Sequence, residues 1–304
     1  MNSVAVWGAG AWGQALAMQA HAAGARVSLW ARSGIQPRLP MRLPEAISIT
    51  PDIAAARGDL TIIAVPVQHL RAVCGALHAR PALLACKGVE VGSARFPTEI
   101  LGWPELGVIS GPNFAAEVAR GLPAASVIAS HDAPLREAAI AALGSAHFRL
   151  YASTDPLGVQ VGGAAKNVLA IAAGAATGAG LGENARAALI TRGLAELTRL
   201  VLALGGRAET ASGLSGLGDL LLTASSATSR NTTLGIRLGQ GETLAAALSA
   251  SRGVAEGVAT APALLARAGT TEMPICAAVA AMLAGQATVR DAMAALLARP
   301  FRAE

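Results

Sequence analysis

Aromatic residues are scarce in this chain, at 3% of 304 residues, and charged residues make up only 14%. So few aromatics argue against an all-β fold, because strands are enriched in aromatic and β-branched residues. Hydrophobic residues reach 53%, the reverse of the balance that keeps chains disordered. Ala, Leu and Val supply most of this apolar content, which predicts a folded protein with a helix-rich interior.

The chain also lacks an uninterrupted membrane-spanning run. Its longest apolar stretch, 159–181, is long enough to cross a bilayer, but it contains Gln160, Lys166, Asn167 and many glycines, so we expect a buried helix there. The first residues show no export signal. Cysteines number three and form no CxxC pair, which suits a reducing compartment. We expect a cytoplasmic protein with no disulfide and no metal site.

Basic residues are scattered along the chain and give a net charge of +5. Nucleic-acid binding would need a basic stripe with stacking aromatics, and the sequence has neither. The positive field suits a small anionic substrate, although composition alone accounts for the charge equally well. The Ala- and Gly-rich helices are compatible with a homodimer.

The first half alternates short apolar runs with Ala-rich stretches, a pattern typical of a parallel sheet flanked by helices. The expected strands are 4–7, 25–30, 60–65, 82–85, 107–109 and 126–129. The proline-rich segment 33–51 is expected to be an irregular connection between the second and third strands. After about Asp155 only helical patterns follow. We predict an α/β protein: a Rossmann-type dinucleotide-binding domain, 1–154, and an all-helical domain, 155–304.

A glycine-rich loop, GAGAWG at 8–13, directly follows the first strand and opens a predicted helix over 14–23. In this context Gly8 permits a tight turn, Gly10 lets the backbone approach a pyrophosphate, and Gly13 lets helix and strand pack closely. The start of the helix presents N–H groups to the anion. The alternative is a glycine-rich turn of any α/β protein, but the strand, motif and helix together favour a dinucleotide site.

The second predicted strand ends without the acidic residue that usually holds the ribose hydroxyls of NAD. Arg32 stands there instead and can accept a 2′-phosphate, so the sequence favours NADP(H) over NAD(H). The alternative is a solvated arginine at the end of a strand.

Lysine occurs only twice, as Lys87 and Lys166, in a chain whose other basic residues are arginine. Lys87 follows a predicted strand, and Lys166 lies in the apolar, glycine-containing segment GGAAKNVL. An ammonium, unlike a guanidinium, can lose its proton when desolvated. A surface lysine is the ordinary alternative, but the rarity of lysine here favours a chemical role.

The chain resembles the bacterial type of NAD(P)-dependent glycerol-3-phosphate dehydrogenase. The matching blocks are GAGAWGQALA at 8–17, CKGVE at 86–90, SGPNFAAEVARGLPAA at 110–125, GGAAKNVLAIAAG at 162–174, ENARAALITRGLAELTRL at 183–200, GLSGLGDLLLT at 213–223, SRN at 229–231 and VAEGV at 254–258. They span nearly the whole chain in the order of the family, which makes the resemblance specific.

The resemblance implies reversible hydride transfer between NAD(P)H and dihydroxyacetone phosphate, giving sn-glycerol 3-phosphate for phospholipid synthesis. It implies that Lys166 is the catalytic acid/base. The implied substrate contacts are Lys87, Gly111, Asn113, Lys166, Asp219, Ser229, Arg230 and Asn231. The implied cofactor contacts are Gly8, Gly10, Ala11, Trp12, Gly13, Arg32, Lys87, Ala115, Arg230, Val254 and Glu256.

Three features depart from the family pattern. Ala11 and Asn113 stand where serine is usual, and the segment 33–51 is shorter than is typical. Two other functions stay open: a hydroxyacid dehydrogenase that also uses a Lys-Asn pair, and a dinucleotide sensor without turnover. The SRN block at 229–231 favours a phosphorylated substrate.

The SRN block precedes a predicted helix over 232–238. Ser229 or Asn231 can cap that helix, while its free N–H groups and the Arg230 guanidinium take a phosphate. For Asp219, an N-terminal helix cap or a partner for the helix dipole is an alternative to a role in the site. A set of charged residues at 192, 196 and 199 is interpreted as an ion-paired helix face.

Overall fold

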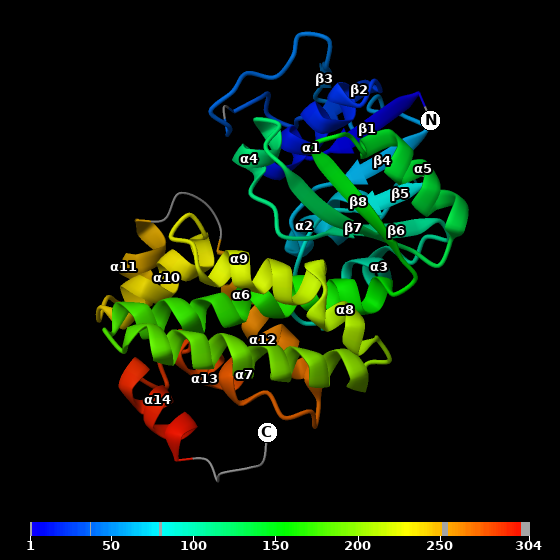
Figure 1. Cartoon of the computed structure of the whole chain (residues 1–304). Helices are drawn as coiled ribbons and strands as arrows, with labels where there is room; N and C mark the ends of the chain where they lie inside the picture. The colour runs from blue at the N-terminus through cyan, green and yellow to red at the C-terminus, as the bar shows by residue number, and fades with distance from the viewer. Residues whose placement is uncertain (1, 37, 79–80, 251–254, 299–304) are drawn as a thin grey trace. The chain divides into compact units, whose positions relative to one another are not determined.

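The computed structural model describes residues 2–36, 38–78, 81–250 and 255–298. It divides into two compact units, the first comprising Met1–Lys87 with Phe96–Gln160 and the second comprising Gly88–Arg95 with Val161–Glu304. Figure 1 shows that the strands belong to the first unit and the long helices to the second. The structure confirms the predicted fold class, a Rossmann-type sheet followed by an all-helical part.

In the described residues the strands form one eight-stranded sheet, in the order β3-β2-β1-β4-β5-β6-β7-β8. Their bounds are β1 Ser3–Trp7, β2 Arg26–Trp30, β3 Ser48–Thr50, β4 Leu60–Ile63, β5 Ala82–Leu84, β6 Leu106–Ser110, β7 Ala124–Ala129 and β8 Phe148–Ser153. The strand order reverses between β1 and β4, so the loop after β1 lies at a topological switch point, where open α/β sheets bind ligands.

Both faces of the sheet are covered, because successive side chains of a strand point to opposite faces. On β1, Val4 and Val6 join one hydrophobic cluster with Leu16, and Ala5 and Trp7 join another. The helices of this unit are α1 Ala11–Ala22, α2 Val67–Cys74, α3 Pro97–Leu101, α4 Ala115–Ala119 and α5 Ala133–Leu143. Continuous burial of such strands explains their unbroken apolar sequences.

The expectation of a parallel sheet is wrong for one pair, because β6 and β7 are antiparallel, with Ile109 opposite Ile128. The connection between them contains only the short helix α4, which packs against α1. A parallel return would need a crossover to the other end of the sheet. Since α4 stays on α1, β7 starts near the end of β6 and runs back along it.

Two strands, β3 and β8, were not predicted. β3 lies inside the segment 33–51, which was expected to be irregular throughout, and its Ser48 and Ile49 are exposed. β8 is also an edge strand, and its Arg149 and Tyr151 are exposed. Edge strands lack the continuous apolar run that marks a buried strand, because one side of each faces solvent.

The described part of the second unit is helical. Its helices are α6 Pro156–Gly178, which starts in the first unit, α7 Gly182–Ala203, α8 Ala208–Ser212, the π-helical turn η1 Leu214–Gly218, α9 Asp219–Ala224, α10 Arg230–Gly239, α11 Leu244–Ser249, α12 Glu256–Ala268, α13 Pro274–Leu283 and α14 Val289–Leu297. Residues 158–176 of α6 are all buried, as expected of a helix that is apolar on every side. None of the described helices has the length and hydropathy that crossing a bilayer requires.

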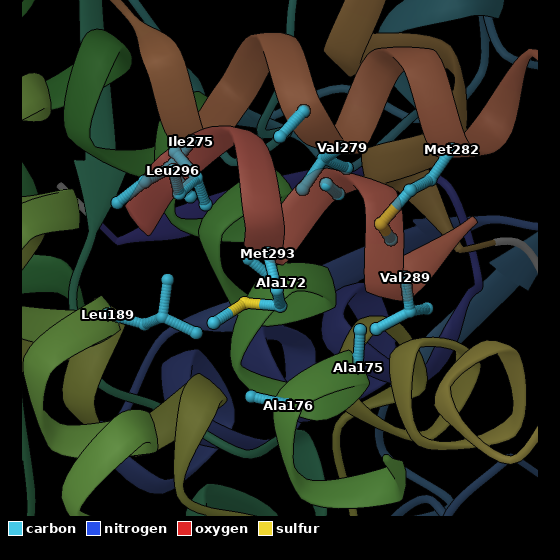
Figure 2. A pocket seen from close by; sticks show the side chains of 12 residues that line it. Ala172, Ala175, Ala176, Leu189, Ile275, Val279, Met282, Val289, Met293 and Leu296 are labelled. Carbon is cyan, nitrogen blue, oxygen red and sulfur yellow. The ribbon is translucent and has the colours of Figure 1, made fainter. Parts of the chain in front are cut away.

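An apolar cavity lies among α6, α7, α13 and α14 (Figure 2). Its empty space is about 290 Å³, including the part open to solvent. Figure 2 shows Ala172, Val279, Met282 and Met293 around it, and every lining residue is Ala, Val, Ile, Leu or Met. A phosphorylated substrate needs charged or hydrogen-bonding partners. This cavity is therefore not the candidate site.

Glu196 does not belong to an exposed ion-paired face, because its side chain is 1% exposed and points at the start of α13. Its carboxylate accepts hydrogen bonds from the backbone N–H groups of Ile275, at 2.6 Å, and Cys276, at 3.2 Å. Burial raises the pKa of Glu196, while these N–H groups and the Arg199 charge partly oppose the rise. A carboxylate from α7 thus caps α13, which has no side-chain cap of its own.

We expect the difference in stability between the Glu196→Gln variant and the unsubstituted protein to shift in favour of the variant as pH rises from about 4 to about 7, because only the unsubstituted protein has a carboxyl group that titrates at this position. A raised folded-state pKa means that the stabilising contribution is complete below the unfolded-state value and is lost as pH rises through the folded-state value. One pKa unit corresponds to about 1.4 kcal/mol. Urea unfolding across this range measures the difference, with Glu183→Gln on the exposed side of α7 as control. Parallel stability curves for Glu196→Gln and the unsubstituted protein would contradict this expectation.

Candidate active site

The glycine-rich loop joins β1 to α1 by close backbone contacts. Gly8 has a φ of +112°, and a Cβ there would lie 2.8 Å from the Ala64 carbonyl oxygen. A Cβ on Gly13 would lie 1.8 Å from the Gly8 carbonyl oxygen, whereas one on Gly10 would meet nothing within 4 Å. Gly8 and Gly13 therefore close the turn, and Gly10 borders open space beside the start of α1.

The start of α1 carries hydrogen-bond donors that suit an anion. Gly10 is its N-cap and supplies no side-chain cap, so the first N–H groups of the helix keep their partial positive charge. The adjacent Ala11 is half-buried and adds no polar side-chain atom. The indole Nε1 of Trp12 is buried and has no hydrogen-bond partner among the described residues. These donors and the open space at Gly10 fit the pyrophosphate of a dinucleotide.

Two further predicted cofactor contacts follow strands at the same carboxyl edge of the sheet. Arg32 is exposed and lies two residues beyond β2, whose last residue, Trp30, pairs with Trp7 of β1. Ala115 is the first residue of α4 and packs against the cluster that contains Leu16 of α1. The structure thus brings Arg32, the loop and Ala115 to one edge of one unit. Val254 lies outside the described residues.

Lys87, Gly111 and Asn113 form a second group in the first unit. The Lys87 ammonium donates to the Gly111 carbonyl oxygen at 3.2 Å. The Asn113 side-chain nitrogen donates to the Ala125 carbonyl oxygen at 3.0 Å and to Ser126 Oγ at 2.7 Å, while Asn113 Oδ1 is buried without a hydrogen-bond partner in the described chain. The Asn113 nitrogen therefore holds β7, and Oδ1 is the atom with unused hydrogen-bonding capacity. An amide oxygen accepts, so it suits a hydroxyl better than a phosphate.

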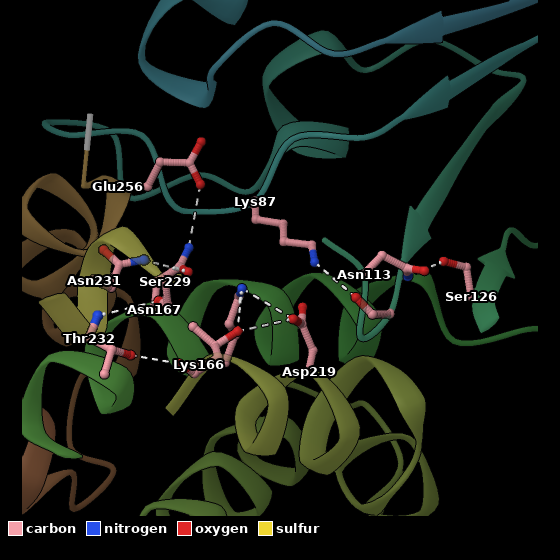
Figure 3. Close-up of polar contacts among 12 residues, drawn as sticks. Lys87, Asn113, Ser126, Lys166, Asn167, Asp219, Ser229, Asn231, Thr232 and Glu256 are labelled. Atoms are coloured by element: carbon pink, nitrogen blue, oxygen red, sulfur yellow. Dashed lines mark hydrogen bonds and ion pairs between the residues drawn. The ribbon is translucent and has the colours of Figure 1, made fainter. Parts of the chain in front are cut away.

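In the second unit Lys166 of α6 meets Asp219 of α9. Lys166 Nζ lies 3.1 Å from Asp219 Oδ1 and donates to Thr223 Oγ1 at 2.9 Å, and Thr223 Oγ1 lies 3.3 Å from Asp219 Oδ1 (Figure 3). Lys166 is 9% exposed and Asp219 only 2%. Asp219 is therefore an ion-pair partner. It is not the N-cap of α9, which is Gly218, but it lies in the first turn of α9, where a carboxylate also suits the helix dipole. Because both side chains are buried, removing either charge would leave the other without compensation for its lost hydration.

Glycines bring α9 to Lys166. A Cβ on Gly162 of α6 would lie 2.6 Å from the Ser215 carbonyl oxygen, and one on Gly216 would lie 1.9 Å from the Ala211 carbonyl oxygen. Ser215 and Gly216 belong to the π-helical turn η1, which leads directly into Asp219. The segment GLSGLGD therefore packs backbone against backbone, and this contact sets where the carboxylate meets the amine.

A chain of side-chain amides links the starts of α10 and α12 to α6 (Figure 3). Asn231 Nδ2 donates to Asn167 Oδ1 at 2.9 Å, and Asn231 Oδ1 accepts from the Gly257 N–H at 3.0 Å. Asn167 Nδ2 lies 3.4 Å from Glu256 Oε2. Asn231 and Glu256 are thus joined through Asn167, the neighbour of Lys166.

Helix α10 starts two residues earlier than predicted, so Ser229 of the two predicted caps is confirmed, and Asn231 lies inside the helix. Ser229 is the N-cap, and its hydroxyl accepts from the Thr232 N–H at 3.3 Å. Arg230 is the first residue of the helix and is exposed, while Asn231 is buried. The N–H groups in the first turn, the exposed guanidinium and the nearby lysine make this end of α10 the part of the second unit best suited to an anion.

Two residues of this region were missed in the sequence. Asn167 connects three helices, and its signal was its place next to Lys166 in the Lys-Asn pair. Thr223 contacts both members of the ion pair, and its signal was its position four residues after Asp219, which puts both side chains on one face of α9.

Comparisons with known proteins find similarity over nearly the whole chain. A family model described as the N-terminus of NAD-dependent glycerol-3-phosphate dehydrogenase matches residues 3–135, and one described as the C-terminus matches 155–294. The glycerol-3-phosphate dehydrogenase [NAD(P)+] of Bradyrhizobium diazoefficiens is 50% identical, covering 100% of this chain and 98% of the relative. The enzyme of the same name from Rhodospirillum rubrum is 49% identical, covering 100% and 94%.

Solved structures agree as well. The glycerol-3-phosphate dehydrogenase of Coxiella burnetii superposes with a TM-score of 0.91 at 34% identity, covering 98% of this chain and 99% of that one. A ketopantoate reductase from Ralstonia eutropha reaches a TM-score of 0.55 at 20% identity, covering 96% and 99%. At that identity the second likeness shows a shared fold alone.

Proposed function

Because this chain belongs to the NAD-dependent glycerol-3-phosphate dehydrogenase family, we propose that it interconverts dihydroxyacetone phosphate and sn-glycerol 3-phosphate with NAD(P)H. The observation that carries the proposal is the buried contact of Lys166 with Asp219 and Thr223, close to the anion-suited start of α10. We assign cofactor binding to the domain 1–154 and proton transfer to the domain 155–304. The product would feed glycerophospholipid synthesis.

In the reductive direction the carbonyl carbon gains a hydride and the carbonyl oxygen gains a proton. The reduced nicotinamide supplies the hydride when it is bound. Lys166 Nζ donates the proton, because an ammonium within hydrogen-bond reach stabilises the charge that develops on oxygen. Asp219 favours the charged, proton-bearing form of the amine at 3.1 Å. In the oxidative direction the neutral amine takes the proton from the alcohol.

The substrate phosphate needs its own site. We propose that the N–H groups at the start of α10 and the Arg230 guanidinium hold it, with Ser229 and Asn231 shaping that end of the helix. In the first unit Lys87 and Asn113 Oδ1 would contact the substrate hydroxyl end, beside the backbone of Gly111. Pyrophosphate binding falls to the loop of Gly8, Gly10, Ala11, Trp12 and Gly13. The remaining proposed cofactor contacts are Arg32, Lys87, Ala115, Arg230, Val254 and Glu256.

The decisive experiment compares a phosphorylated with an unphosphorylated ketone. NADPH oxidation would be followed with dihydroxyacetone phosphate and with hydroxyacetone. We expect kcat/KM to be at least about 100-fold higher for dihydroxyacetone phosphate, because the phosphate contributes binding energy that hydroxyacetone lacks. Equal values, or preferential reduction of an unphosphorylated 2-keto acid, would point to another reductase of this fold. Cofactor binding without turnover would point to a sensor.

For the cofactor we propose a preference for NADPH, resting on Arg32. We expect Arg32→Ala to raise the KM for NADPH at least about tenfold and to change the KM for NADH by less than about twofold, because only NADPH carries the 2′-phosphate. Arg26→Ala is the matched control, since Arg26 is exposed at the opposite end of β2. A Michaelis constant for NADPH that stays constant in Arg32→Ala would remove the basis for this preference.

We also propose a cytoplasmic location. The three cysteines, all among the described residues, are buried thiols with no disulfide between them. Burial raises the pKa of Cys74 to about 12 and raises that of Cys276 as well. Thiols of this kind are unreactive and suit a reducing compartment.

A further inference from the structure

Helices α6 and α10 cross with their backbones in contact. Gly174 and Gly178 lie four residues apart on α6, and Gly235 and Gly239 lie four residues apart on α10, so each pair shares one helix face. A Cβ on Gly174 would lie 2.2 Å from the Thr232 carbonyl oxygen. We name these four glycines the four-glycine seam.

Every position of the four-glycine seam excludes a side chain. A Cβ on Gly178 would lie 2.0 Å from the Ile236 carbonyl oxygen, one on Gly235 would lie 2.1 Å from the Ile171 carbonyl oxygen, and one on Gly239 would lie 2.3 Å from the Ala175 carbonyl oxygen. Each obstacle is backbone, which cannot rotate away as a side chain can. Alanine in the seam would therefore force the two helix axes apart.

Stability alone does not account for these glycines. Glycine inside a helix destabilises it relative to alanine, and alanine is the commonest residue of α6 itself. The four seam glycines, two on α6 and two on α10, fall at the contact between these helices and share the same kind of backbone neighbour. What they provide is a closer approach of two helices than alanine allows.

The four-glycine seam connects the two ends of the proposed substrate site. Lys166 lies roughly two helical turns before Gly174 on α6, and Arg230 lies about one turn before Gly235 on α10. At the near end of the crossing, Asn231 Nδ2 donates to Asn167 Oδ1 at 2.9 Å, and Thr232 Oγ1 donates to the Thr223 carbonyl oxygen at 2.6 Å. The separation of α6 and α10 across the seam therefore affects the distance between the Lys166 amine and the start of α10.

We propose that the four-glycine seam is a positioning device that sets the separation between the Lys166 amine and the anion-binding start of α10, and so selects ketones with a phosphate at the matching distance. This inference rests on the proposed function. A displacement of about 1 Å from the productive geometry can lower a rate about 100-fold. A methyl group held 2.0–2.3 Å from a carbonyl oxygen demands a shift of that size.

The test measures discrimination by phosphate in Gly174→Ala and Gly178→Ala. We expect the ratio of kcat/KM for dihydroxyacetone phosphate to that for hydroxyacetone to fall at least about tenfold, mainly through a higher KM for the phosphorylated ketone. The KM for NADPH is measured in parallel, because Arg230 of α10 was also predicted to contact the cofactor, although the glycine-rich loop belongs to the other unit. Partial unfolding would lower the maximal rate with both ketones equally and would leave the ratio unchanged.

Gly193→Ala is the matched control. Gly193 lies on α7 and also faces α6, but the three atoms nearest to its Cβ would all belong to the Leu169 side chain, the first at 2.9 Å. We expect this variant to keep the ratio of the unsubstituted protein. Gly239→Ala, in the last turn of α10 and only half-buried, is the second seam variant if either α6 variant fails to fold.

The outcomes separate this inference from the proposed function. If the unsubstituted protein does not prefer the phosphorylated ketone, the proposed function fails. If it does, and folded seam variants keep that preference within about twofold, the positioning role is overturned. The same conclusion follows if Gly193→Ala lowers the ratio as much as the seam variants do.

Discussion

Replacing Lys166 by alanine is expected to lower kcat for dihydroxyacetone phosphate at least about 100-fold, the usual contribution of a positioned proton donor. The KM for NADPH should change by less than about twofold, because the predicted pyrophosphate contacts belong to the first unit. Steady-state kinetics in both directions measure the effect. A variant that turns over like the unsubstituted protein, with normal cofactor binding, would exclude Lys166 from the mechanism.

A charge control is needed, because Lys166→Ala leaves Asp219 buried without its cation. Breaking a buried pair on one side typically destabilises a protein by about 3–5 kcal/mol, whereas replacing both partners by neutral groups of similar volume is often harmless. The double variant Lys166→Met with Asp219→Asn should therefore be more stable than Lys166→Met alone, with kcat equally low. Thermal unfolding monitors stability in each case. Recovery of turnover in the double variant would show that the loss came from the stranded carboxylate and not from the missing amine.

Replacing Arg230 by alanine is expected to raise the KM for dihydroxyacetone phosphate at least about tenfold, equivalent to about 1.4 kcal/mol. A guanidinium at the first position of α10 interacts unfavourably with the helix dipole, and a bound phosphate would offset this cost. The KM for hydroxyacetone should not change, because it has no phosphate. Arg230 was also predicted to contact the cofactor, so the KM for NADPH is measured in parallel.

Arg237→Ala is the matched control for Arg230, since it removes the same charge from the same helix. Arg237 lies 3.4 Å from Glu242 and donates to the Ala247 carbonyl oxygen, near the far end of α10. We expect the KM for dihydroxyacetone phosphate to be unaffected there. If Arg230→Ala behaves like Arg237→Ala, the phosphate binds elsewhere.

The central strands were predictable because each is covered on both faces. β4, Leu60–Ile63, is buried at every position and is apolar except for Thr61. β8 escaped prediction because Arg149 and Tyr151 face solvent at the edge of the sheet. The direction of β7 depends on α4 packing against α1, a contact between segments about 100 residues apart, which no local pattern encodes.

The candidate site likewise has one part that the sequence predicts and one part that depends on contacts between distant segments. The glycine-rich loop is contiguous, so the sequence shows its glycines, its strand and its helix together. The bond from Lys166 to Thr223 joins residues 57 apart in the chain, and it exists because Gly162 lets η1 approach α6. The structure also decided that Asn231 is bound on both ends of its amide and that Asn113 keeps only its oxygen unpaired.

By itself the sequence determined the fold class, the dinucleotide motif and the rarity of lysine, because local periodicity and residue chemistry survive in any packing arrangement. Tertiary structure alone decided which carboxylate meets Lys166 and how closely α10 approaches α6. The physical reason is that such contacts are set by backbone approaches between helices distant in the chain. A glycine in the sequence indicates that another backbone can approach closely, and only the tertiary structure shows which segment does so.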